Sequence, residues 1–508
     1  MSVNVSIPAT VPVLARICPK SLIGLSIEMD RWADWAGGAV GTPNAFLNQA
    51  LNNLANYTGH PVFLRVGANS QDHGFLAPNV QVVNLTFPEP TQLVPQPEAA
   101  HIAIGRDWYR LSGNLPEGTE FTWGVNLREL NVSETVGQVV QLYDAFYGSD
   151  KEMLSHVYLK RIEMGNEPDI YDFPNPLNPN RTLPGWGPIR YVESWTTAAR
   201  EVIKAVDMDF KEAPGFQAGV IADPFGAWTY TIAQSLVDGI LDPAVAKYIK
   251  TWSVHQYFGN RGFTPATSPQ TGSLMGRSGV RGNTTKHALY SSQAERAGLQ
   301  YVIGETNSFS LHGTPGVSDS AEAAIWLADY VLQAATLNVQ QLDFHGGVGF
   351  AYNLIQAVEY VDEHTNDTRP PHIQGAYYGA LMANEFIGYG SDVHVAELST
   401  FNTRIAAYGA WESDHLRRVL ILNSNVHDPG RNATRTFETI NLHGFVTSGK
   451  KLALKRFFTP QTNSTVGLLW GGQSFETVDA VPTGQVEYEY IDRPIFNVSA
   501  TEGVLVCF

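Results

Sequence analysis

The sequence has few charged residues, and its basic residues are outnumbered. Only 16% of the 508 residues are charged, and 33 Lys and Arg against 49 Asp and Glu give a formal net charge of −16. Such a surface repels phosphate backbones and anionic lipid, so we expect neither nucleic acid nor a membrane surface as a partner. No apolar run reaches the roughly 18 residues of a membrane-spanning helix, which predicts a soluble protein.

Cysteine is almost absent, and metal-binding motifs are missing. The two cysteines, Cys18 and Cys507, cannot build a zinc cluster or a disulfide framework. They could form one bridge between the two ends of the chain, or they could be two isolated buried thiols. There is no His-Glu-x-x-His motif and no Gly-x-Ser-x-Gly elbow, so we expect no metal, no cofactor and no serine-hydrolase chemistry.

The first residues also lack the basic segment and apolar core of a signal peptide. Asn-x-Ser/Thr sequons are nevertheless frequent, and ten spread along one chain predict a secreted, extracellular protein with N-glycans. We therefore interpret the start as a mature or recombinant one from which a leader has been removed. The sequons begin at Asn4, Asn56, Asn84, Asn131, Asn180, Asn283, Asn366, Asn432, Asn463 and Asn497.

Short apolar runs alternate with helix-like stretches over the first three quarters of the chain. Leu47, Leu51 and Leu54 share one helical face, for example, and residues 321–337 form an Ala- and Leu-rich run after Ser318-Asp319-Ser320. Eight strands alternating with helices predict an α/β fold, a (β/α)8 TIM barrel over residues 20–387. The eight runs are Leu22–Met29, Pro61–Gly67, Glu120–Leu127, Arg161–Pro168, Gly215–Ala222, Thr251–Tyr257, Gln300–Asn307 and Val339–Gly347.

After about residue 388 the helical pattern disappears. Short strand-like segments separated by turn residues predict a C-terminal antiparallel β-sandwich domain over residues 388–508, joined by the N-terminal segment 1–19. The predicted strands are Arg404–Trp411, Leu416–Asn423, Thr436–Leu442, Leu452–Phe458, the alternating Val486–Tyr490, and Val504–Val506. The Pro- and Asn-rich stretch Pro168–Pro188 is expected to be a loop above the barrel mouth.

Two glutamates lie where barrel enzymes place their chemistry. Glu167 closes the predicted fourth strand in Met164-Gly165-Asn166-Glu167-Pro168, and Glu305 closes the seventh in Ile303-Gly304-Glu305-Thr306-Asn307. These two strand ends lie on opposite sides of a barrel mouth, so the carboxylates can face each other. Glycoside hydrolysis needs such a pair, one as a protonated acid and one as a base or nucleophile.

An Asn-Glu-Pro at the fourth strand and a glutamate at the seventh resemble the large clan of retaining (β/α)8 glycosidases. Within that clan, residues 161–169, 304–316 and 22–32 most resemble glycoside hydrolase family 79, the β-glucuronidases and heparanases, and the resemblance covers essentially the whole chain. It implies that Glu167 is the general acid/base and Glu305 the nucleophile. It also implies that a short N-terminal segment joins the C-terminal strands, which would bring Cys18 near Cys507.

The resemblance assigns further residues to the substrate. Asn166 would bind the sugar 2-hydroxyl, and Tyr257 would steady the nucleophile unless it is only a core aromatic residue of strand six. Tyr352, beside the glycines after strand eight, would donate to the uronate carboxylate. His345 would bind the sugar, although a structural histidine is an alternative.

Glu28 and Asn69, at the ends of strands one and two, match family positions that hold sugar hydroxyls. Alternatively, Glu28 forms a salt bridge with Arg65 or Arg31, and Asn69 caps a turn. One stretch departs from heparanases, which carry a tyrosine followed by several glycines after the nucleophile. Residues 309–313 are bulkier here, and Ser310 or His312 could take over that contact.

These observations predict a retaining exo-β-glucuronidase that releases terminal glucuronic acid, with or without a 4-O-methyl group, from glycans or glucuronides. The alternatives are an endo-β-glucuronidase of heparanase type, a non-catalytic glycan-binding wall protein, and another sugar specificity in the clan, such as arabinofuranosidase. The net charge argues against an enzyme for sulfated chains, and the presence of both glutamates argues against a protein that has lost catalysis.

Overall fold

The computed structural model describes residues 2–8, 10–91, 96–172, 182–222, 230–262, 264, 266–362, 366–430, 434–444 and 451–508. The predicted loop 168–188 therefore lies partly outside the described residues. Among the described residues, no helix has the length and apolar character that crossing a membrane requires.

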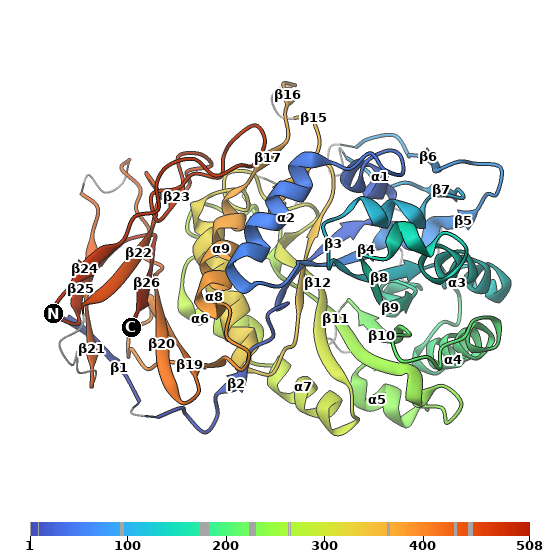
Figure 1. Ribbon diagram of the computed structural model, residues 1–508, viewed down its shortest axis with the longest axis horizontal. Coiled ribbons are helices and arrows are strands. Elements are labelled where there is room, and N and C mark those ends of the chain that lie inside the picture. The colour runs from blue at the N-terminus through green and yellow to red at the C-terminus, as the bar shows by residue number, and fades with distance from the viewer. Residues whose placement is uncertain are drawn as a thin grey trace.

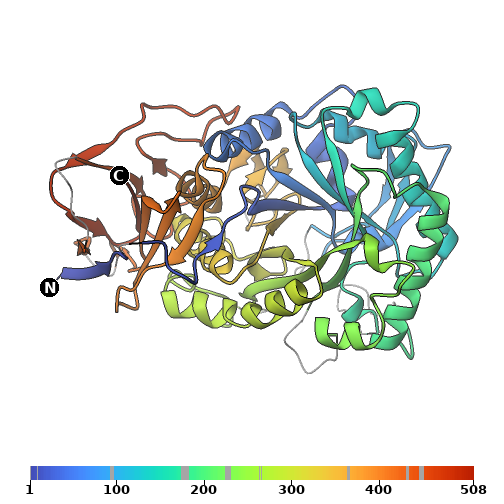
Figure 2. The ribbon, with the colours of Figure 1, turned by 60° about the horizontal axis from the view of Figure 1, so that its bottom comes forward.

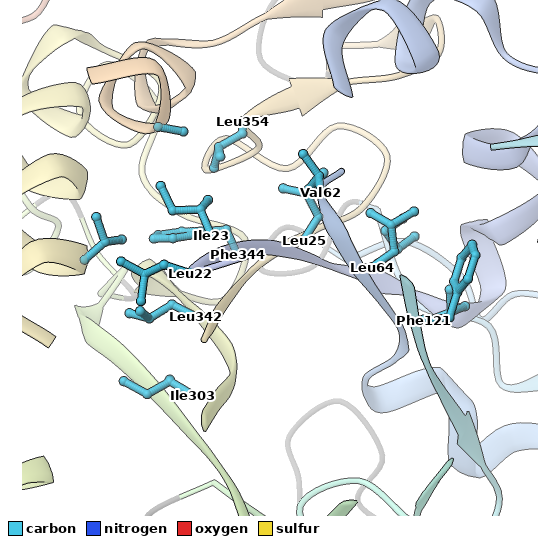
Figure 3. Packing of buried hydrophobic residues seen from close by; sticks show 14 of the residues in the cluster. Leu22, Ile23, Leu25, Val62, Leu64, Phe121, Ile303, Leu342, Phe344 and Leu354 are labelled. Atoms are coloured by element: carbon cyan, nitrogen blue, oxygen red, sulfur yellow. The ribbon is translucent and has the colours of Figure 1, made fainter. Parts of the chain in front are cut away.

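Eight parallel strands close into a barrel, which confirms the predicted fold class. Their interior and outer faces are both buried, as the continuous apolar runs predicted. Figure 3 shows the packing around the first, second and last strands, where Leu25, Leu64 and Phe344 lie in one apolar layer. The barrel strands are β3 (Ile23–Glu28), β4 (Phe63–Gly67), β8 (Glu120–Val125), β9 (Tyr158–Met164), β10 (Gly215–Ile221), β11 (Ile249–Asn260), β12 (Gln300–Ser310) and β13 (Leu342–Gly346).

Helices surround this barrel, and two of them are covered on both sides. Residues 321–335 of α8 are all buried, because α8 and α9 lie between the barrel and the C-terminal sheet (Figure 1). Ser320 occupies the N-cap position of α8 as predicted, but its hydroxyl donates to Val317 O and does not cap the helix. The helices are α1 (Trp32–Ala36), α2 (Ala45–Thr58), α3 (Val132–Tyr147), α4 (Pro188–Ala205), α5 (Ile232–Val237), α6 (Arg277–Thr284), α7 (His287–Arg296), α8 (Ala321–Thr336) and α9 (Gly375–Ile387).

Two insertions interrupt the barrel pattern. A small sheet of β5 (Gly74–Leu76), β6 (Val83–Thr86) and β7 (His101–Ile104) follows the second barrel strand. After the eighth barrel strand, β14 (Ile355–Gln356) pairs with β17 (His372–Ile373), and β15 (Tyr360–Val361) pairs with β16 (Thr368–Arg369). Neither insertion is apparent in the pattern of apolar runs.

The C-terminal domain consists of two sheets over a second apolar core. The N-terminal segment contributes to both, since β2 (Arg16–Ile17) pairs with β18 and β1 (Ser2–Ser6) pairs with β21 (Figure 2). The β1–β21 pair is parallel, so the domain is not purely antiparallel. Its other strands are β18 (His394–Glu397), β19 (Ile405–Glu412), β20 (His415–Asn423), β21 (Phe437–His443), β22 (Leu452–Phe458), β23 (Leu469–Trp470), β24 (Glu489–Ile491), β25 (Ile495–Ser499) and β26 (Glu502–Cys507).

One strand prediction for this domain is wrong, and the structure decides between the two alternatives for the cysteines. The alternating segment Val486–Tyr490 is exposed throughout and enters a strand only at Glu489, where the short strand β24 pairs with β22. Cys18 and Cys507 are free and not close together. Cys18 follows β2, and Cys507 lies in β26, four strand spacings away in the order β2-β18-β19-β20-β26. That separation is roughly 19 Å, whereas a disulfide needs Cα atoms within about 7 Å.

Candidate active site

The two glutamates predicted from the sequence lie close together at the barrel mouth. Glu167 follows the end of β9, whereas Glu305 lies within β12, which continues to Ser310 and so does not end where the sequence predicted. A carboxylate oxygen of Glu167, one of Glu305 and a ring nitrogen of His255 all lie within 4.8 Å of one another. Retaining glycosidases hold their two carboxyl groups about 5–5.5 Å apart, and inverting enzymes separate them by about 6.5–9.5 Å. The spacing is therefore the one that allows direct attack by one carboxylate.

A strained turn presents Glu167 to the barrel mouth. Gly165 has a φ of 79°, and a Cβ there would lie 2.5 Å from the Tyr171 hydroxyl, so glycine is required. Glu167 itself is left-handed, with φ 50° and ψ 55°, and its N–H donates to Val220 O at 3.0 Å. Non-glycine residues in this region cost about 1–3 kcal/mol and concentrate at functional sites.

A β-bulge places Glu305 beside His255. In the β11–β12 pair, Val254 pairs with Ile303 but His255 pairs with Glu305, so Gly304 is the extra residue. Bulges next to active sites commonly redirect a side chain in this way. His255 Nδ1 is then hydrogen bonded to Glu167 Oε1 at 2.9 Å and lies 3.8 Å from Glu305 Oε2. Burial lowers the pKa of His255 to about 4, so the ring is neutral.

Arg65 fixes the position and the charge of Glu305. It is fully buried, and its Nη1 donates to Glu305 Oε2 at 2.7 Å. The same guanidinium donates to Glu163 Oε1 at 2.6 Å and to Asn166 Oδ1 at 2.8 Å. The alternative in which Arg65 pairs with Glu28 is therefore wrong: one arginine instead joins the nucleophile candidate, a buried counter-charge and the predicted 2-hydroxyl ligand.

The two candidate carboxyl groups have opposite pKa shifts. Burial and the negative charge of Glu305 raise the pKa of Glu167 to about 8. Burial also disfavours ionised Glu305, but His345 and Arg65, with the Tyr257 hydroxyl, outweigh it and hold its pKa well below the usual range. One group is thus protonated and the other ionised at neutral pH, which is the division of roles that acid and nucleophile need.

Tyr257 contacts Glu305 as the family resemblance implies, and the binding of a sugar 2-hydroxyl by Asn166 stays a prediction. The Tyr257 hydroxyl donates to Glu305 Oε1 at 2.8 Å. The Asn166 N–H donates to Asp72 Oδ2 at 3.0 Å, and its side-chain Nδ2 donates to Asn69 Oδ1 at 3.2 Å. The Asn69 side chain therefore contacts Asn166, and the capping alternative is not what the geometry shows.

Glu28 and His345 form a buried pair behind the site. Glu28 Oε1 accepts from the Ser70 N–H at 2.6 Å, and Glu28 Oε2 lies 3.1 Å from His345 Nε2. Arg31 instead lies against Asp30, so neither arginine pairs with Glu28. Because Glu28 is fully buried, its contact with a sugar hydroxyl stays a prediction. Burial disfavours charged His345, but Glu305 and Glu28 outweigh it and raise the pKa of His345.

Tyr352 is held close to the carboxylate pair from the other side. Its ring centroid lies 6.0 Å from that of Tyr257. Asn307 Nδ2 donates to both Tyr352 O and His345 O, at 3.0 and 2.8 Å, which fixes the loop after the eighth strand to the seventh strand. Burial and the charge of Glu305 raise the pKa of Tyr352, so its hydroxyl stays a donor.

His312 and Ser310, the two residues considered for the uronate contact, have other partners. His312 Nε2 lies 3.0 Å from Glu98 Oε1, and its ring stacks on Phe350 with centroids 3.6 Å apart. Ser310 Oγ accepts from Asn260 Nδ2 at 3.3 Å. Hydrogen bonding to His312 outweighs burial and lowers the pKa of Glu98, so this carboxylate is ionised beside the site. Glu98 precedes β7 in the first insertion, and nothing in the sequence pointed to it.

Arg65 should stabilise the folded protein as well as the negative charge of Glu305. Arg65→Met leaves Glu163 and Glu305 buried without compensation, and breaking a buried pair in this way costs about 3–5 kcal/mol. We expect a thermal midpoint several degrees lower by differential scanning calorimetry. Arg200→Met, which removes the exposed ion pair with Asp242, is the matched control. Its free energy of unfolding should stay within about 1 kcal/mol of the wild-type value. Equal midpoints for the two variants would contradict the role of Arg65.

Known proteins that are similar to this chain are glycoside hydrolases. Residues 407–505 match the family model "Glycosyl hydrolase family 79 C-terminal beta domain". A protein of Aspergillus niger named β-glucuronidase is 26% identical over 94% of this chain and 86% of its own length. A β-glucuronidase of Neurospora crassa is 25% identical over 93% of this chain and 87% of its own length.

Solved structures share the fold over almost the whole chain. A 4-O-α-L-rhamnosyl-β-D-glucuronidase from Fusarium oxysporum 12S covers 99% of this chain and 100% of its own, with a TM-score of 0.80 and 22% identity. A family 51 arabinofuranosidase from Xanthomonas axonopodis pv. citri covers 99% of both chains, with a TM-score of 0.61 and 11% identity.

A (β/α)8 barrel with a carboxyl pair at its mouth, and relatives of this kind over nearly the whole chain, define a glycoside hydrolase. Within that class, residues 407–505 match the C-terminal β domain of glycoside hydrolase family 79, and the chain as a whole is similar to β-glucuronidases.

Proposed function

We propose that this enzyme is a retaining exo-β-glucuronidase, with Glu305 as the nucleophile and Glu167 as the general acid/base. The observation that carries the proposal is the pair of opposite pKa shifts on two carboxyl groups whose oxygens lie within 4.8 Å. The names of the Aspergillus and Neurospora relatives support the choice of β-glucuronides as substrates.

The first step forms a glycosyl-enzyme. A carboxylate oxygen of Glu305 attacks C1 of the glucuronosyl residue, and the bond from C1 to the leaving oxygen breaks. Glu167 donates its proton to that oxygen, so the aglycone leaves as an alcohol. The bond that Asn166 makes to the 2-hydroxyl strengthens as positive charge develops at the ring. Arg65 holds the Asn166 side chain for this contact.

The second step is hydrolysis of that ester. Once Glu305 is esterified its negative charge is gone, so the pKa of Glu167 falls and the group becomes a base. Glu167 takes a proton from water, the water oxygen attacks C1, and the electron pair of the ester bond returns to Glu305. The product is β-glucuronic acid, and the proton that Glu167 gains is ready for the next turnover.

The remaining residues position the sugar and the charges. Tyr257 steadies Glu305, and Asn69 and His345 line the glycone side, with Glu28 orienting His345 through its 3.1 Å contact. Tyr352 supplies the donor for the uronate carboxylate, since its hydroxyl remains protonated. The engagement of His312 by Glu98 argues against His312 as the principal carboxylate ligand.

Tyr352→Phe should test recognition of the uronate carboxylate separately from glycoside hydrolysis. The variant loses one hydrogen bond to a charged group, worth about 1.5–3 kcal/mol, so KM for an aryl β-glucuronide should rise roughly tenfold to hundredfold. KM for the matching β-glucoside should change little. Tyr147→Phe, on the outer helix α3, is the control and should leave both KM values unchanged. Equal increases for glucuronide and glucoside would remove the carboxylate role and leave the hydrolase intact.

A panel of aryl glycosides that differ only at C6 or in ring type tests the specificity itself. We expect the glucuronide to be hydrolysed with the highest kcat/KM, with the glucoside and the arabinofuranoside far slower. Preference for the arabinofuranoside would favour the alternative specificity that the shared fold also permits. Release of oligosaccharides from within a long glucuronide polymer would favour the endo-acting alternative.

We also propose that the protein is a secreted glycoprotein. Seven of the sequon asparagines that the structure describes are exposed at the surface, where glycosylation requires them. Endoglycosidase treatment of protein secreted from a eukaryotic host should lower its apparent mass; an unchanged mass would oppose the proposal. The seven are Asn4, Asn56, Asn84, Asn131, Asn366, Asn463 and Asn497.

A further inference from the structure

Asp72 is a buried aspartate at the barrel mouth that has no part in the proposed two-step reaction. It lies in the short helix η2 (Asn69–His73), which follows the second barrel strand, β4, and only 3% of its surface is exposed. Burying a carboxylate is costly unless hydrogen bonds or counter-charges compensate it. In Asp72, hydrogen bonds supply this compensation.

Four donors converge on the Asp72 side chain. Its Oδ1 accepts the backbone N–H groups of Leu127 and Arg128, at 3.0 and 3.2 Å. Its Oδ2 accepts the backbone N–H of Asn166 at 3.0 Å and the hydroxyl of Tyr171 at 2.7 Å. A hydrogen bond to a charged group is worth about 1.5–3 kcal/mol, so the four together hold the carboxylate and its donors in one geometry.

These donors come from the loops after two further barrel strands. Two of them follow β8 and two follow β9. Asp72 therefore joins the loops after β4, β8 and β9, which are neighbours in the barrel. Because Asn166 precedes Glu167 and Tyr171 follows it, Asp72 fixes the segment that carries the proposed acid/base on both of its sides.

The helix that carries Asp72 is itself fixed in the barrel mouth. Gln71 lies so close to β4 and β8 that a Cβ at Gly67 or Gly124 would be 2.4 or 2.2 Å from its Oε1. Asn126 Nδ2 also donates to the backbone O of Asp72 at 3.1 Å. Close-packed interiors yield little to strain, so Asp72 holds the loop after β9 against a rigid part of the structure.

The turn at Glu167 needs such support because its backbone is strained. Its left-handed conformation, with φ 50° and ψ 55°, costs about 1–3 kcal/mol. The hydrogen bond from the Asn166 N–H to the charged Asp72 is of the same size, about 1.5–3 kcal/mol. Without it, the turn should relax and Glu167 should move away from the leaving oxygen. Misplacement of a catalytic group by about 1 Å can lower a rate about 10²-fold.

We propose that Asp72 is a positioning residue, which holds Glu167 in place for protonation of the leaving oxygen. The inference rests on the proposed function, since it presupposes that Glu167 is the general acid/base. Asp72 acts through the Asn166 backbone and the Tyr171 hydroxyl. Its contribution should therefore depend on how much a reaction needs the proton of Glu167.

Asp72→Asn tests the proposal with the smallest change in shape. An amide has one acceptor oxygen, and that oxygen should stay with the N–H groups of Leu127 and Arg128. In this orientation the Tyr171 hydroxyl can accept from the new NH2 group, and only the Asn166 N–H loses its acceptor. The opposite orientation would leave two backbone N–H groups unpaired. The substitution therefore removes the one contact that supports the turn.

The effect of Asp72→Asn should depend on the leaving group. The kcat/KM for phenyl β-glucuronide should fall about 10²-fold, because this leaving group needs a proton. The value for 2,4-dinitrophenyl β-glucuronide should fall less than about fivefold, because this leaving group needs none. Glu322→Gln is the matched control, since Glu322 is also a buried carboxylate that accepts backbone N–H groups. It should lower both values by the same factor.

A double-mutant cycle separates positioning from a purely structural role. In wild type, Asp72→Asn should raise the ratio of kcat/KM for the 2,4-dinitrophenyl substrate to that for the phenyl substrate at least about tenfold. In Glu167→Ala there is no acid to position, so adding Asp72→Asn should change this ratio less than about twofold.

Equal losses for the two leaving groups in Asp72→Asn, in protein whose thermal midpoint shows that it is folded, would overturn the inference. Independent effects of Asp72→Asn and Glu167→Ala on the ratio would do the same. If Asp72→Asn does not fold, Tyr171→Phe removes one of the four contacts and leaves the carboxylate in place; an unchanged ratio in that variant would then overturn it. If Glu167→Ala itself affects both leaving groups equally, the proposed function fails as well.

Discussion

Glu305→Gly should lower kcat for an aryl β-glucuronide by about 10⁴-fold or more, because no other carboxylate can attack C1 from that face. Arg65 would remain as a positive charge beside an empty space at the same position. Azide can enter that space as a small anionic nucleophile. Added azide should therefore restore turnover and give a glycosyl azide of inverted, α configuration.

The control for this experiment is Glu322→Gly. Glu322 is also a buried glutamate, but it lies on α8 and accepts the backbone N–H groups of Gly272 and Leu274 instead of contacting the carboxylate pair. Azide should have no effect on whatever activity it retains. Substantial activity of Glu305→Gly without azide would contradict the nucleophile assignment, as would a product of β configuration in its presence.

Glu167→Ala should affect substrates according to their leaving group. General acid catalysis contributes about 10²–10⁴-fold, so a phenyl glucuronide, whose leaving group needs a proton, should lose activity by about that factor. A 2,4-dinitrophenyl glucuronide needs no protonation and should form the glycosyl-enzyme at nearly the normal rate. Azide should then attack that intermediate and give the azide of retained, β configuration, opposite to the product of Glu305→Gly.

The pH dependence of kcat/KM tests the same residue. Glu167 acts as an acid only while protonated, and its pKa is raised to about 8, so wild-type activity should fall as the pH increases through that value. Glu167→Gln cannot titrate and should lose this alkaline limb. An unchanged alkaline limb in Glu167→Gln, or equal losses for the two leaving groups in Glu167→Ala, would contradict the acid/base assignment.

The barrel and its carboxylate pair can be predicted from the sequence for a simple reason. Parallel strands buried on both faces leave continuous apolar runs, and the residues that end those runs meet at one rim. Glu167 and Glu305 therefore stand out locally, although 137 residues separate them. The position of His255 in the site could also be predicted, since His255 lies two residues before Tyr257 in one strand and so shares its face.

The sequence suggests Arg65 only as a partner for Glu28, although a charged residue at this position indicates more. A fully charged residue inside Phe63–Gly67, an otherwise apolar strand, has to be paired when it is buried. What the sequence could not show was which carboxylates pair with it. Glu163 and Glu305 come from two other strands, and their distance from Arg65 is a property of the closed barrel.

Features that depend on insertions or on strand order cannot be predicted from the local pattern of apolar and polar residues. Glu98 reaches the site from the first insertion. The separation of Cys18 from Cys507 follows from three strands that lie between β2 and β26. The alternation in Val486–Tyr490 was misleading, because its side chains are exposed on both faces.

The stereochemistry of the first product tests the central claim most directly, because it follows from the distance between two carboxyl groups. Proton NMR of a reaction with an aryl β-glucuronide should show β-glucuronic acid forming first, with the α anomer appearing later by mutarotation. Initial formation of α-glucuronic acid would mean a single displacement by water, and would contradict a mechanism in which Glu305 bonds to the sugar.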